Sequence, residues 1–204
     1  MATVSLDDVR IEAFIAGNWV DLTPDCLDEA TWKYGIDGNT PEDCTASPGA
    51  LAFTLDNSEN NSAQTLGYYS PRHANKRSGW AFGIPVRVVL DYGSDVVKFY
   101  GKIQTIDPDP GEALQRKVRV VANDGIFDLL EAKVREIDVQ LDQDEAQLID
   151  AVLDAIPSAA QPLARSLDDG VNILPVAFDD LQGGTSALTL IQALTVSIVI
   201  AHIL

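Results

Sequence analysis

The sequence predicts an α+β protein, in which an antiparallel β-barrel or sandwich is followed by a smaller α/β part. Up to about residue 123, short segments of alternating apolar residues are separated by turn-forming glycine, proline and asparagine. This pattern is typical of antiparallel sheets. After Asp124 the apolar residues recur at helical spacing instead. We therefore predict a β-rich domain over residues 1–138 and an α/β part over residues 139–204.

The β-rich part contains segments with the apolar pattern of strands at 9–16, 18–22, 30–36, 51–55, 84–90, 97–103 and 115–122. Gly17 predicts a hairpin turn between the first two segments. Turns are also expected at 92–94 and, because of its two prolines, at 107–111. In the segment 51–55 the odd-numbered residues are apolar, which predicts a strand with one buried face.

A long polar segment at 57–79 predicts a surface loop, and loops of this length are usually functional or mobile. Tyr68, Tyr69, His73 and Trp80 lie on or beside it. Exposed aromatic side chains are favoured in protein interfaces and in sugar-binding platforms, so these residues are a candidate interface. The alternative is that they fold back and cover the core of the β-domain.

The second part predicts helices at 126–134, with Asp124 as N-cap, and at 145–156, ended by Pro157. Asp142 followed by Glu145 resembles a capping box for the second helix. A strand is expected at 171–178 and a further helix at 185–194. The β-branched run 196–200 predicts a buried strand.

The formal net charge is −17, and eleven of the fourteen basic residues lie between Arg72 and Arg135. Both flanks of the chain are therefore strongly acidic, which argues against tight binding of nucleic acid. One interpretation is that the charge maintains solubility. The other is that an acidic surface lines a passage through which DNA slides without adhering.

The N-terminus lacks the basic and apolar regions of a signal peptide. Residues 186–204 carry no charge and have the length of a membrane span, but they contain polar residues and lack a basic flank. We therefore expect no membrane span.

No catalytic, cofactor or metal site is predicted, and we expect the protein not to be an enzyme. Asp107, Asp109 and Glu112 could chelate calcium, but a proline turn already explains them. A nucleophilic triad would need His73 or His202, the only histidines. The sequence shows neither metal-ligand spacing of cysteine and histidine nor a glycine-rich phosphate loop.

Between Ser47 and Asp124 the strand and turn signals follow a characteristic order. Its pieces are SPGALAFTLDN at 47–57, YYSP at 68–71, GIPVRV at 83–88, VKFYGKI at 97–103 and VRVVAND at 118–124. This series resembles the N-terminal region of phage minor tail proteins, the tail-hub family at the tip of long-tailed bacteriophages. The resemblance extends over residues 4–195.

The resemblance implies a structural virion protein that links the tail tube to the host-recognition apparatus. Such hubs form rings of three, so the expected partners are the protein itself and other tail proteins, at the virion tail tip and in the host cytoplasm during assembly. In that reducing compartment Cys26 and Cys44 would be free thiols. Because family members continue for several hundred residues, we expect the second part to be incomplete.

Two other functions remain open at this point. The chain could be a carbohydrate-binding module that recognises the host envelope through Tyr68 and Trp80. It could also be a tail-associated peptidoglycan hydrolase, although no catalytic site supports this.

Overall fold

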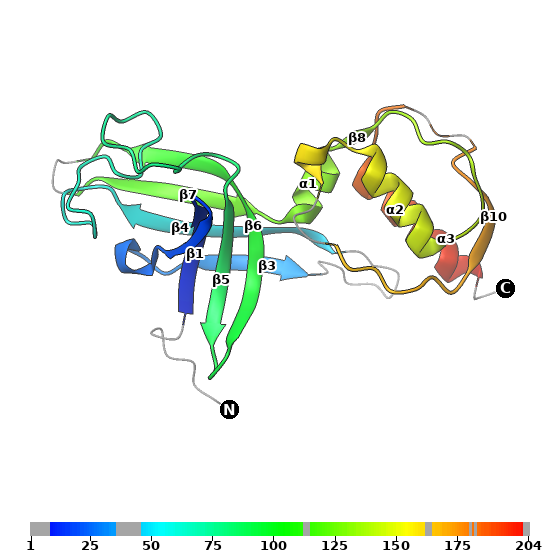
Figure 1. The fold of residues 1–204 in the computed structure, drawn as a ribbon, viewed down its shortest axis with the longest axis horizontal. Helices are drawn as coiled ribbons and strands as arrows, with labels where there is room; N and C mark the ends of the chain where they lie inside the picture. The colour runs from blue at the N-terminus through cyan, green and yellow to red at the C-terminus, as the bar shows by residue number, and fades with distance from the viewer. Residues whose placement is uncertain are drawn as a thin grey trace. The chain divides into compact units, whose positions relative to one another are not determined.

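The computed structural model describes residues 9–35, 46–111, 115–161, 165–179, 181 and 183–201. The chain forms two compact units, one made of Met1–Tyr34 and Gly49–Asp124 and the other of Gly35–Pro48 and Gly125–Leu204 (Figure 1). This division lies earlier in the chain than the expected boundary at 138/139. The reason is that the first helix after Asp124 packs with the last helix of the chain and so belongs to the second unit.

The first unit is built on a seven-stranded sheet with the strand order β2-β1-β5-β6-β7-β4-β3. Its strands are β1 (Val9–Ile15), β2 (Asn18–Asp21), β3 (Thr31–Gly35), β4 (Ser47–Asp56), β5 (Pro85–Asp91), β6 (Asp95–Asp109) and β7 (Lys117–Asn123). The β1–β2, β1–β5, β5–β6, β6–β7 and β4–β7 pairings are antiparallel. The predicted antiparallel β-rich fold is thus confirmed. Within the described ranges, however, β2 and β3 remain edges and the sheet does not close into a barrel.

Strand β6 joins the two halves of this sheet. Its first part pairs with β5, from Asp95 to Lys102, and its second part pairs with β7, from Lys102 to Asp109. The prediction of a turn at 107–111 is therefore wrong for Asp107–Asp109, which lie in the strand. A register shift between Ile103 and Thr105 precedes this part of β6, and after it Ile106 is buried in the core.

The predicted β1–β2 hairpin is present. Ala16 and Gly17 form its turn with φ angles of 51° and 87°. Positive φ at both central residues is the conformation whose twist matches the flanking strands, and glycine adopts it without strain.

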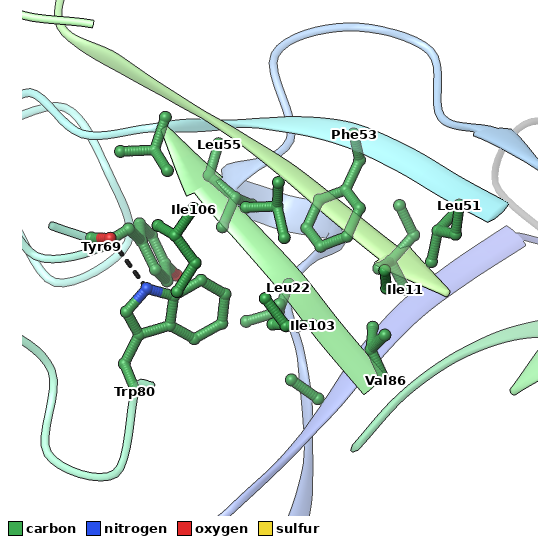
Figure 2. Close-up of a cluster of buried hydrophobic side chains, with 14 of the residues drawn as sticks. Ile11, Leu22, Leu51, Phe53, Leu55, Tyr69, Trp80, Val86, Ile103 and Ile106 are labelled. Carbon is green, nitrogen blue, oxygen red and sulfur yellow. Dashed lines mark hydrogen bonds between the residues drawn. The ribbon is translucent and has the colours of Figure 1, made fainter. Parts of the chain in front are cut away.

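The core of the first unit lies on one face of the sheet and includes the alternating residues Leu51, Phe53 and Leu55 of β4, as predicted. Val86 and Ile103 contribute from β5 and β6. The segment between β4 and β5 adds large side chains to the same cluster (Figure 2).

The described residues of the second unit form three α-helices and several short strands. They are α1 (Gly125–Glu131), β8 (Lys133–Val134), β9 (Gln140–Asp144), α2 (Glu145–Ala155), β10 (Ile173–Ala177), β11 (Thr185–Ser186) and α3 (Ala187–Ala201). Strand β9 pairs with β10 and β8 pairs with β11, both antiparallel. Helices α1, α2 and α3 contribute to a core that includes Leu129, Val152 and Leu188.

Three local predictions for this unit are wrong. Val134 pairs with Thr185 in a strand and does not continue a helix. The capping box of α2 is formed by Asp144 and Gln147, not by Asp142 and Glu145, and Asp142 adopts a φ of 50° in β9.

The third concerns residues 196–200, which continue α3 and do not form a strand. The run contains no glycine or proline to end the helix. Extending a formed helix costs less free energy than starting a new element. No helix in the described ranges is long and apolar enough to cross a membrane.

Candidate interaction surface

The long segment between β4 and β5 is held in place by buried amide side chains. The Asn57 Oδ1 accepts a hydrogen bond of 2.9 Å from the backbone N–H of Tyr69, and the Asn57 amide donates to Ser70 Oγ. The Asn61 amide donates to the carbonyl oxygens of Ser58 and Thr65, at 2.7 and 2.8 Å. These bonds satisfy backbone groups that strand pairing would otherwise satisfy, so the segment is ordered without regular secondary structure.

A buried carboxylate provides a second anchor. Asp25 is 4% exposed and lies in a 3-10 turn (Thr23–Asp25) between β2 and β3. It accepts hydrogen bonds from the Ser62 backbone N–H at 2.6 Å, from Ser62 Oγ at 2.7 Å and from the Tyr69 hydroxyl. Burial, and then the neighbouring Asp25, raise the pKa of Tyr69, so its hydroxyl stays protonated and donates.

The predicted interface residues occupy two different environments. Tyr69 and Trp80 are fully buried and pack edge to face, with ring centroids 5.2 Å apart (Figure 2). The Trp80 indole N–H donates to the Tyr69 carbonyl oxygen at 2.8 Å. These two side chains therefore fold back over the core, as the alternative interpretation expected.

Tyr68 and His73 are half-buried. The Tyr68 ring packs edge to face on Tyr69, with centroids 5.1 Å apart, and the Arg77 guanidinium lies 5.4 Å from the centroid of the Tyr68 ring. The His73 Nδ1 accepts a hydrogen bond from the Asn75 backbone N–H at 3.2 Å. A contact of Tyr68 and His73 with a partner remains a proposal.

The structure gathers a different set of aromatic side chains on the outer face of the sheet. In β1, Ile11, Ala13 and Ile15 face the core, so Phe14 faces outward. Phe14 pairs with Trp19 of β2, and their ring centroids are 5.3 Å apart. Tyr100 of β6 lies edge-on to Trp19 at 5.8 Å. We call Phe14, Trp19 and Tyr100 the sheet-face aromatic cluster.

Charged side chains hold this cluster in position. The Arg87 guanidinium stacks over the Trp19 ring, 4.2 Å from its centroid. It also forms an ion pair of 2.7 Å with Glu12, which lies opposite Arg87 in the β1–β5 register. Arg10 contacts Glu12 at 3.5 Å and Asp95 at 2.6 Å. Because the aromatic rings are fixed before any partner binds, the cluster would lose little conformational entropy on binding.

Sequence reasoning selected the loop aromatics and missed this cluster. A signal was present, since a two-residue turn at 16–17 places residue 14 opposite residue 19. The approach of Tyr100 depends on the β1–β5–β6 order, which the sequence does not reveal.

In the described part of the chain, no three histidine, cysteine or acidic side chains are grouped to hold a metal ion. Asp107 and Asp109 lie opposite Arg119 and Lys117 of β7. Glu112, Cys44 and His202 lie outside the described residues. Cys26 is a free thiol, and burial, followed by the charges of Asp21 and Asp25, raises its pKa to about 12.

No protein-family model and no curated protein matches the sequence. The fold is similar to the crystal structure of the tail protein from Neisseria meningitidis MC58, with a TM-score of 0.51 and 10% identity, over 93% of this chain and 45% of that chain. This likeness shows the fold. The 43 kDa tail protein of prophage MuSo2 from Shewanella oneidensis gives a TM-score of 0.46 and 12% identity, over 91% of this chain and 48% of that chain. The chain thus spans less than half the length of either structure.

Proposed function

We propose that the chain is a structural component of a bacteriophage tail. The observation that carries this proposal is the fold, which is similar over almost the whole chain to that of a solved tail protein. The ordered strand and turn signals between Ser47 and Asp124 support the same proposal, because they are a property of the sequence and do not depend on the comparison of folds.

Within the tail, we propose a position at the tip, as a hub or minor tail protein that links the tail tube to the host-recognition apparatus. In this role the protein acts by assembly and not by catalysis, and its partners are further copies of itself, in a ring of three, and other tail proteins. The sheet-face aromatic cluster supports an assembly role, since tryptophan, tyrosine and arginine supply much of the binding energy of protein interfaces.

The alternative of a carbohydrate-binding module loses its main support. It depended on Tyr68 and Trp80 as an exposed platform. Trp80 is fully buried with its indole N–H already bonded, and Tyr68 is half-buried with the Arg77 guanidinium over its ring. Sugar-binding aromatic rings need an accessible face. Trp19 does not replace it, because the Arg87 guanidinium lies over that ring.

A gene deletion tests the proposed function. Phage particles produced without the gene should fail to form infective tails, and plaque formation should return when the chain is supplied from a plasmid. A variant with a stop codon early in the supplied gene is the control. Normal infectivity of the deletion phage would contradict a required structural role.

A further inference from the structure

The β9–β10 ribbon of the second unit exposes large apolar side chains. Leu141 of β9 and Val176 of β10 lie directly opposite each other and are 59% and 48% exposed, and Ile173 is 69% exposed. A two-stranded ribbon is stable only when it packs on something else. Leu174 and Ala177 pack on the α2 and α3 residues Leu148 and Leu194, which satisfies one side of the ribbon. The opposite side has no partner within the described residues.

The ribbon keeps one register throughout, with one position left unpaired. The register matches Leu174 with Gln143 and Val176 with Leu141, and Asp142, between them, has a φ of 50°. In β10, Leu174 and Ala177 pack on the core, whereas Val176 is exposed beside Leu141. We call the exposed apolar residues Leu141, Ile173 and Val176 the ribbon patch.

The charges around the ribbon patch are of one sign. Asp138, Asp142 and Asp179 are exposed on or beside the two strands. From Glu136 to Leu204 the only lysine or arginine is Arg165, and it pairs with Asp150 and Asp154. A surface that docks on this patch must therefore combine apolar area with basic side chains.

The sheet-face aromatic cluster has this composition. Phe14 and Tyr100 are 38% and 39% exposed, and Arg10, Arg87 and Lys102 lie around them on the same face of the sheet. Arg87 pairs there with Glu12, and Arg10 pairs with Glu12 and Asp95, so the three basic side chains stand beside these two acidic ones. The first unit holds eleven basic and fifteen acidic residues, whereas the second holds three basic and sixteen acidic residues, so the second is much the more acidic of the two. The ribbon patch with its acidic surroundings is therefore attracted more to this face than to a second acidic ribbon, because like charges repel.

We propose that the ribbon patch of one copy docks on the sheet-face aromatic cluster of a second copy. The contact is heterologous, because it joins two different surfaces, and it leaves one free surface of each kind on every pair. Repetition therefore builds a closed ring or a filament. The inference rests on the proposed function and deepens it, by naming the two surfaces through which copies of a tail component would assemble.

Disulfide trapping tests the contact directly. Two single-cysteine proteins are prepared in a background with Cys26→Ser and Cys44→Ser, one carrying Tyr100→Cys and the other Leu141→Cys. The proposal predicts a disulfide-linked dimer when the two proteins are mixed and oxidised, and almost none when either is oxidised alone. Trapping within one variant alone would indicate a symmetric contact and overturn the proposal, as would absence of the mixed dimer.

Association of the unmodified chain is measured in parallel by analytical ultracentrifugation. Tyr100→Ser and Leu141→Ser should each weaken self-association about tenfold or more, because each removes an apolar group from the centre of the contact. The matched controls are Tyr92→Ser and Leu130→Ser, which change exposed residues of the same types elsewhere and should alter the dissociation constant by less than about twofold.

A wild-type chain that stays monomeric up to about 100 μM would overturn the proposal. Equal effects of the test and control substitutions would do the same. The two proposals can fail separately. If the ring forms as described but the phage does not need the chain, this contact is supported and the structural role in the tail is refuted. If the phage needs the chain but its copies do not associate through these surfaces, the structural role is supported and this contact is refuted.

Discussion

The indole N–H of Trp80 donates a 2.8 Å hydrogen bond to the carbonyl oxygen of Tyr69, and both side chains are fully buried. This bond closes the long segment between β4 and β5 onto the core of the sheet (Figure 2). The segment is therefore part of the folded core and not a mobile appendage.

Replacing Trp80 with phenylalanine should destabilise the first unit by about 1–3 kcal/mol, because it leaves the Tyr69 carbonyl unpaired and opens a small cavity. Urea unfolding followed by circular dichroism measures the change in free energy. Phe82→Leu, at an exposed position of the same segment, is the control and should stay within about 0.5 kcal/mol of the wild type. Equal stabilities of wild type and Trp80→Phe would show that the bond does not hold the segment.

Removing the buried carboxylate should loosen the same segment. In Asp25→Ala the Tyr69 hydroxyl and the Ser62 N–H lose their acceptor, and we expect a loss of about 2–4 kcal/mol. Trypsin should then cleave at Arg72 and Lys76 faster than in the wild type, since local opening governs proteolysis. Asp28→Ala, at an exposed position after the same turn, provides the comparison. An unchanged cleavage rate would show that Asp25 does not hold the segment in place.

The Cys26 thiol should be unreactive at neutral pH. Burial, with the charges of Asp21 and Asp25, raises its pKa from the ordinary 9.0 to about 12, so almost none is thiolate. In a Cys44→Ser background, reaction with a chromogenic disulfide at pH 8 should be at least about a hundredfold slower than in the unfolded protein. Rapid modification of the folded chain would contradict this.

The same shift predicts a dependence of stability on pH. Because the folded-state pKa lies above the unfolded value, the contribution of the thiol is complete below pH 9.0 and is lost as the pH rises toward about 12. Cys26→Ala should therefore lose less stability than the wild type over this interval, as measured by urea unfolding at a series of pH values. Parallel curves for the two proteins would show that the thiol does not titrate in this way.

Gly101 should not tolerate a side chain. A Cβ at this position would lie 2.3 Å from the carbonyl oxygen of Asn123 in β7, which is backbone and cannot move aside alone. Gly101→Ala should destabilise the sheet by about 1–3 kcal/mol through this clash. Thermal unfolding measures the effect, and Gln104→Ala, at an exposed position of the same strand, serves as the control. A melting temperature equal to the wild type would contradict the close approach.

The elements that the sequence predicted well are those with a strong local pattern. The alternation of Leu51, Phe53 and Leu55 predicted a strand with one buried face, and the apolar stripe of 145–156 predicted α2. In both cases the residues that define the element are neighbours in the sequence.

Features that depend on distant residues could not be predicted in the same way. Asp25 acts through Ser62 and Tyr69, and the inward position of Ile106 depends on a register shift relative to β7. The burial of the candidate interface residues also depends on contacts between residues distant in the sequence. Tyr69 and Trp80 are aromatic residues in a polar segment, and only the packing of that segment on the sheet decides that they are buried.

The proposed place of the chain in the virion is the tip of the phage tail. Immunogold electron microscopy of purified phage particles, with antibodies raised against this chain, would locate it there or elsewhere. We expect gold particles at the tail tip, and none on particles from the deletion phage. Labelling confined to the head, or particles that contain none of the chain by mass spectrometry, would contradict a structural role at the tail tip.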